Sequence, residues 1–103
     1  MNYDPENKDT FFYVDKYDMV LHRDDPLSWR DSIGRNFDAW IAWRDERFIE
    51  AVKRCFKYGL QRHPAHWTND MSRDHVSYAL ILFAHTKRWV SFFLLANKLK
   101  WLP

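Results

Sequence analysis

Two Arg-Asp steps are the part of this sequence whose residue types best suit chemistry. They are Arg30-Asp31 and Arg73-Asp74, and His75 follows the second. Carboxylates and an imidazole serve as general acids and bases when they are placed against a substrate. Each Asp also stands in the first turn of an expected helix, where the helix dipole favours a carboxylate by about 0.3–1 kcal/mol. Asp31, Asp74 and His75 are therefore candidate catalytic residues, with helix initiation as the alternative that needs no chemistry.

His63 and His66 are the candidate metal ligands. Imidazoles and carboxylates bind zinc and other divalent ions, and Asp70 and Asp74 follow these histidines. However, Pro64 interrupts any helix that would place both histidines on one face. The sequence also has no Cys-rich or His-Glu-x-x-His pattern. We expect loop histidines, no bound metal and no cofactor.

A run of basic residues in the second expected helix could bind phosphate groups, as nucleic-acid-binding helices do. Acidic residues are interleaved with it, so a solvated face with ion pairs three and four residues apart explains it equally well. A nucleic-acid partner is thus an alternative and not the first expectation. The basic residues are Arg47, Lys53, Arg54 and Lys57, and the acidic ones are Asp45, Glu46 and Glu50.

Helices must position all these residues. Ile33, Phe37, Trp40 and Ile41 have the spacing of one helix face, and the pattern recurs after Asp45, which is a suitable N-cap. A left-handed residue at Gly59 would end the second helix. We expect an all-α fold of two consecutive helical hairpins, over residues 26–60 and 72–102, joined by a loop over 60–71. In the second hairpin, Ser72 is the expected N-cap, Met71 packs against Val76, and the third helix ends near His85.

The first 25 residues form an acidic arm. They hold seven acidic and three basic residues, whereas residues 26–103 hold seven acidic and thirteen basic ones. Aromatic and β-branched residues at 11–14 and 19–22 flank a turn sequence, which predicts an extended strap or a short β-hairpin. We expect this arm to dock on the basic helical domain, residues 26–103, and the alternative is a basic face that awaits an acidic partner.

The composition indicates one soluble domain. The chain has 103 residues, of which 47% are hydrophobic and 18% aromatic. Its single cysteine, Cys55, excludes an intramolecular disulfide. We find neither an apolar run of membrane-spanning length nor a signal peptide, so a cytoplasmic location is expected.

The two hairpins echo each other, since "WRDSI" and "SRDHV" both open a helix and lie one hairpin apart. In this respect residues 26–102 resemble the α/α-hairpin repeat proteins, including the α/α-toroid glycosidases and polysaccharide lyases. The resemblance implies a carbohydrate-active fragment or subunit whose cleft forms on assembly. A complete toroid needs several more hairpins, so we assign no catalytic residue from this resemblance.

The third and fourth expected helices are apolar on nearly all sides, and four helices alone can hardly cover them. We therefore expect a protein-interaction or structural module that self-associates or docks on a larger protein. Carbohydrate and nucleic-acid binding remain as alternatives. The expected interface residues are Trp89, Phe92, Phe93, Leu95, Leu99, Trp101 and Leu102.

Overall fold

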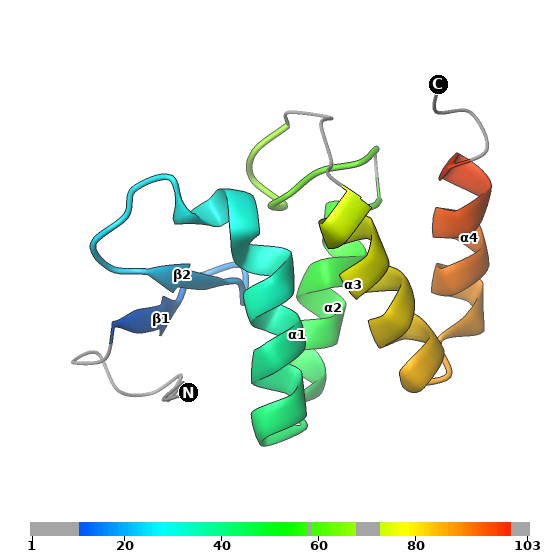
Figure 1. Cartoon of the computed structure of the whole chain (residues 1–103), viewed down its shortest axis with the longest axis horizontal. Helices are drawn as coiled ribbons and strands as arrows, with labels where there is room; N and C mark the ends of the chain where they lie inside the picture. The colour runs from blue at the N-terminus through cyan, green and yellow to red at the C-terminus, as the bar shows by residue number, and fades with distance from the viewer. Residues whose placement is uncertain (1–10, 58, 68–72, 100–103) are drawn as a thin grey trace.

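The computed structural model describes residues 11–57, 59–67 and 73–99. In this part, a two-stranded antiparallel sheet precedes four helices (Figure 1), so the fold is mostly helical and the expected all-α class is only roughly confirmed. The expected N-terminal strap or hairpin is a hairpin. The elements are β1 (Phe12–Val14), β2 (Val20–His22), the 3-10 turn η1 (Ser28–Asp31), α1 (Ser32–Trp43), α2 (Glu46–Cys55), α3 (Arg73–His85) and α4 (Trp89–Leu99).

The hairpin turn is organised by Asp15. Its Oδ1 accepts hydrogen bonds from the backbone N–H groups of Tyr17 at 2.8 Å and Met19 at 3.0 Å. Asp18 then takes a left-handed conformation with φ of 62°, which an aspartate tolerates better than most residues. The turn thus brings Val20 opposite Val14 in the strand register and directs Met19 and Val20 into the core.

The corner between α1 and α2 follows the sequence prediction. Arg44 ends α1 in the left-handed region, with φ of 54° and its N–H donating to the Trp40 carbonyl. The Asp45 side chain then accepts from the N–H of Arg47, as an N-cap does, so this prediction is confirmed. The two helices can therefore fold back on each other directly.

Other boundary predictions have mixed outcomes. The first hairpin is expected from residue 26, but α1 begins at Ser32, because residues 28–31 form η1 and the Ser28 hydroxyl accepts from the N–H of His22. The expected stop at Gly59 is wrong, since α2 ends at Cys55. The helix end at His85 is confirmed, whereas Ser72 and Met71 lie outside the described residues.

Helices α2 and α3 both lie against α1, and α4 lies against α3 at the edge of the molecule (Figure 1). One core joins them. Its largest fully buried side chains include Phe48, Phe83, Met19, Ile33, Ile49, Leu82 and Leu95. None of the helices in the described ranges is long and apolar enough to cross a lipid bilayer.

Two acidic residues of the arm contact the helical domain. Asp15 pairs with His63 at 2.6 Å, and Asp18 lies 3.6 Å from a guanidinium nitrogen of Arg54. Arg54 also donates to the Tyr17 carbonyl at 2.8 Å. The basic side of the domain is thus partly occupied by the chain's own acids.

Candidate functional site

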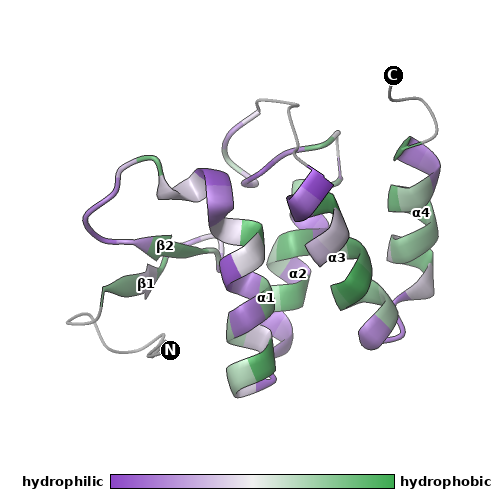
Figure 2. Ribbon diagram, in the orientation of Figure 1, coloured by the Kyte–Doolittle hydropathy of each residue, from purple (hydrophilic) through white to green (hydrophobic). Residues whose placement is uncertain are grey.

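Helix α4 exposes more large apolar side chains than any other helix in the described part of the chain. Relative exposure reaches 76% for Val90, 63% for Phe93, 61% for Leu94 and 48% for Trp89. Leu95 alone among its eleven residues is fully buried. Figure 2 shows the hydrophobic colour continuing along this outermost helix. We call these four exposed residues the α4 face.

The aromatic rings of α4 hold one another in place. The ring of Trp89 lies 5.7 Å from Phe92 and 6.3 Å from Phe93, and the two phenylalanine rings are 5.3 Å apart and nearly perpendicular. Edge-to-face pairs of this kind stabilise by about 0.5–1.5 kcal/mol beyond the area they bury. Phe92 packs against the core, so it connects the exposed rings to the fixed interior.

Both ends of α4 are attached to the α2 side of the molecule. The Lys98 ammonium donates to the carbonyls of Phe56 and Gly59, just beyond the end of α2. At the other end, Arg88 forms an ion pair with Glu46, and its backbone N–H donates to the Phe83 carbonyl at 2.8 Å. These contacts and buried Leu95 hold the helix in position while the α4 face stays open to solvent.

The expected interface residues divide into three groups. Trp89 and Phe93 lie on the α4 face, Phe92 and Leu99 are half-buried, and Leu95 is in the core. Trp101 and Leu102 lie outside the described residues. Sequence reasoning omitted Val90 and Leu94, although the all-round apolar pattern of the helix already included them. On α3, Tyr78 and Ile81 are also exposed, at 43% and 55%.

Basic candidates for nucleic-acid binding form ion pairs within the chain. Arg47 pairs with Asp45 at 3.0 Å, Lys53 with Glu50 at 3.3 Å, and Arg54 with Asp18 at 3.6 Å. Lys57 is exposed at the end of the same stripe. The pair of Lys53 and Glu50 has the predicted spacing of three residues, whereas Arg47 pairs two residues away and Arg54 pairs with the β-hairpin.

Two of the three catalytic candidates come together. His75 Nε2 lies 3.3 Å from Asp31 Oδ1, which joins the start of α3 to the start of α1. The pKa of His75 is lowered from 6.5, because burial and the positive charge of Arg62 outweigh the opposite effect of Asp31. Asp74 is exposed in the first turn of α3. The pair is placed to join two helices, and it lines neither the hollow between α2 and α4 nor the one at the exposed side of α4.

The two histidines proposed as metal ligands have other roles. His63 is buried; its Nδ1 accepts from the N–H of Ala65 at 3.0 Å, so the proton is on Nε2, which donates to Asp15 Oδ2. His66 stacks on Trp29, with ring centroids 4.0 Å apart and an interplanar angle of 3°. Among the described residues, no group of three His, Cys, Asp or Glu side chains is arranged to hold a metal ion.

Comparison with known proteins gives no family for the chain: no family model matches it, and no curated protein or solved structure shows significant similarity to it.

Proposed function

We propose that this protein is a small helical protein-binding module that self-associates through the α4 face. The observation that carries the proposal is the exposure of Val90, Phe93 and Leu94, each above 60%, on a helix that is firmly attached to the core. Burying apolar area stabilises by about 25 cal/mol per Å². Contiguous apolar patches on soluble proteins commonly mark interaction sites.

The character of the face favours a second copy as the partner. Val90 and Leu94, and likewise Trp89 and Phe93, are four residues apart and form two parallel rows along the helix. Helix α4 carries no acidic residue, and its one basic residue, Lys98, is directed toward α2. Two such faces can pack antiparallel about a twofold axis, where each row meets its counterpart without opposing like charges.

The test compares the molar mass of the wild-type protein and two variants by light scattering over a range of concentrations. The molar mass of the wild-type protein should rise from 12.7 kDa toward twice that value as the concentration increases. Val90→Glu places a charge at the most exposed position of the face and should weaken association by about tenfold or more, or about 1.4 kcal/mol. Ala42→Glu, at an exposed position of α1, introduces the same charge elsewhere and should associate like wild type.

Two results would count against self-association through this face. One is a wild-type protein that stays at 12.7 kDa at every concentration. The other is an oligomer that Val90→Glu leaves unchanged, which would place the interface elsewhere.

A further inference from the structure

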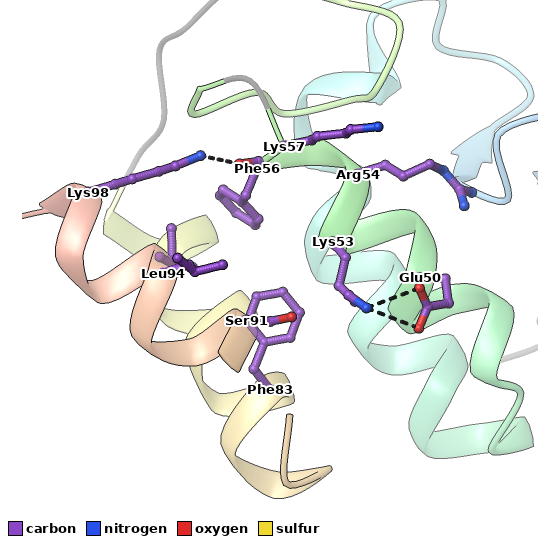
Figure 3. A pocket seen from close by; sticks show the side chains of 10 residues that line it. Glu50, Lys53, Arg54, Phe56, Lys57, Phe83, Ser91, Leu94 and Lys98 are labelled. Atoms are coloured by element: carbon purple, nitrogen blue, oxygen red, sulfur yellow. Dashed lines mark hydrogen bonds and ion pairs between the residues drawn. The ribbon is translucent and has the colours of Figure 1, made fainter. Parts of the chain in front are cut away.

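A second surface adjoins the α4 face on the side where the helix faces α2, and Leu94 borders both. A groove of about 440 Å³ opens between the two helices, and Figure 3 shows its side chains. Phe56, Phe83 and Leu95 form its floor, with relative exposures of 7%, 1% and 1%. Leu94 stands on its α4 wall and is well exposed. The groove exists because α4 packs on α3 and not on α2.

The two walls of the groove differ in chemistry. The α4 wall is formed by Ser91 and leucines, whereas the wall at α2 carries Lys53, Arg54 and Lys57. In Figure 3 Lys53 is turned toward Glu50, and the Arg54 guanidinium is directed away from α4, where it pairs with Asp18. Lys98 adds a fourth basic side chain at one end, and Glu50 is the one acidic residue of the lining. The lining therefore has a net charge of +3 around an apolar floor.

We propose that this groove binds an amphipathic helix of another protein, with an acidic face toward α2 and an apolar face toward α4 and the floor. Grooves between helices accept helices because anchors at i, i+3, i+4 and i+7 reach the floor together. An extended strand would need a free sheet edge, and both walls here are helices whose backbone groups are bonded internally. The groove has room for the anchoring side chains, so the partner's backbone lies over the opening.

The chain's own helices do not have the required chemistry, which is why the occupant is a different protein. Among the four described helices, α4 has no carboxylate and α2 has more bases than acids. Helices α1 and α3 each carry one Arg and one Asp. An acidic partner is favoured because the lining carries four basic side chains and one acidic one, and a complementary charge on the partner increases the association rate and the specificity.

The experiment uses a fluorescent model peptide of about three heptads, with Leu at positions a and d and Glu outward, and a counterpart with Lys in place of Glu. Fluorescence anisotropy with the full chain should show binding of the Glu peptide that weakens as salt is added, and much weaker binding of the Lys peptide. Lys57→Glu, at an exposed position of the rim, should weaken binding of the Glu peptide by about five- to tenfold. Lys16→Glu makes the same charge change in the β-hairpin and should have no comparable effect.

Two further variants separate the groove from the α4 face. Ser91→Phe fills the groove without changing its charge and should abolish peptide binding. Val90→Glu, which lies outside the groove, should leave peptide binding unchanged even where it disrupts self-association. The proposal for the groove and the proposal for the α4 face can thus be refuted separately.

Three outcomes would overturn the proposal. Equal binding of the Glu and Lys peptides would remove the role of the basic wall. Loss of binding in Lys57→Glu no greater than in Lys16→Glu would place the peptide elsewhere. Binding of decanoate, blocked by Ser91→Phe, without binding of the Glu peptide would assign the groove to a small anionic amphiphile.

Discussion

The side-chain oxygen of Asn36 accepts a hydrogen bond from the backbone N–H of Val20 at 2.8 Å, with both residues buried. The same amide donates through Nδ2 to the carbonyls of Asp18 at 2.9 Å and Phe48 at 3.1 Å. One polar side chain of α1 therefore joins the hairpin turn, strand β2 and helix α2. Its donors and acceptor are satisfied in the interior, where an unsatisfied group would be costly.

Replacing this amide should destabilise the whole domain. Asn36→Ala leaves the buried N–H of Val20 without this partner and removes the bonds to the carbonyls of Asp18 and Phe48. A buried group left unsatisfied costs about 1–3 kcal/mol. We expect the free energy of unfolding to fall by about 2–4 kcal/mol, measured by urea denaturation followed by circular dichroism. Asn97→Ala, at an exposed position of α4, is the matched control and should stay within about 0.5 kcal/mol of wild type. Equal stability of the two variants would show that the Asn36 network contributes little.

The contact between Asp15 and His63 should make stability depend on pH in the acidic range. Burial alone would raise the pKa of Asp15, but hydrogen bonds from His63 and from the N–H groups of Met19 and Tyr17 outweigh it and hold this pKa below 3.8. Since the folded pKa is below the unfolded one, the folded state binds fewer protons. The stabilisation is present above pH 3.8 and is lost as the pH falls through the folded pKa.

Asp15→Asn tests this contact. At neutral pH the melting temperature of the variant should be lower than that of wild type, because a charged hydrogen bond contributes about 1.5–3 kcal/mol. The difference should shrink as the pH is lowered below about 4. If the difference in melting temperature between wild type and variant stays constant down to about pH 3, ionised Asp15 is not the source of the stabilisation. Asp24→Asn, in an exposed part of the same arm, should change the melting temperature little at neutral pH.

His75 should titrate below the ordinary range of a histidine. Burial and Arg62 lower its pKa from 6.5, and Asp31 partly opposes them. An NMR titration of the imidazole C2 proton should therefore give a midpoint below 6.5, and Asp31→Asn should lower that midpoint further. Because the unfolded state binds this proton more readily, His75 contributes stability above pH 6.5 that is lost as the pH falls toward the folded pKa. A midpoint above 6.5, or one that Asp31→Asn raises, would contradict the described environment.

Local signals were enough to predict most of the helical part. The Asp45 cap and the helix end at His85 depend on residues close in sequence, and both were predicted correctly. The start of the first helix, expected from residue 26, was not: η1 occupies residues 28–31, and the Ser28 hydroxyl accepts from the N–H of His22 in the preceding strand. The Asn36 hydrogen bonds could not be predicted from the sequence for a similar reason, since the three partners lie 12 to 18 residues away.

The candidate surface was predictable in kind but not in detail. A helix that is apolar on all sides indicates that another molecule covers the part of its surface that its own domain does not. Such a helix has no polar face, so its sequence does not show which side packs against the core. Leu95 was therefore expected at an interface and lies in the core, whereas Val90 was omitted and is the most exposed residue of the α4 face. The groove could not be predicted, because it depends on how α2 and α4 are placed in space. The sequence pattern of each helix carries no information on that placement.

The most direct test of self-association is the rate at which a thiol at position 90 reacts with a maleimide as the protein concentration is raised. Native Cys55 is fully buried, and burial raises its pKa, so it should react slowly and contribute little. If the α4 face pairs with a second copy, the thiol of Val90→Cys should react quickly in dilute protein and progressively more slowly at higher concentration. The thiol of Ala42→Cys should react at one rate throughout. A rate at position 90 that does not change with concentration would contradict the account.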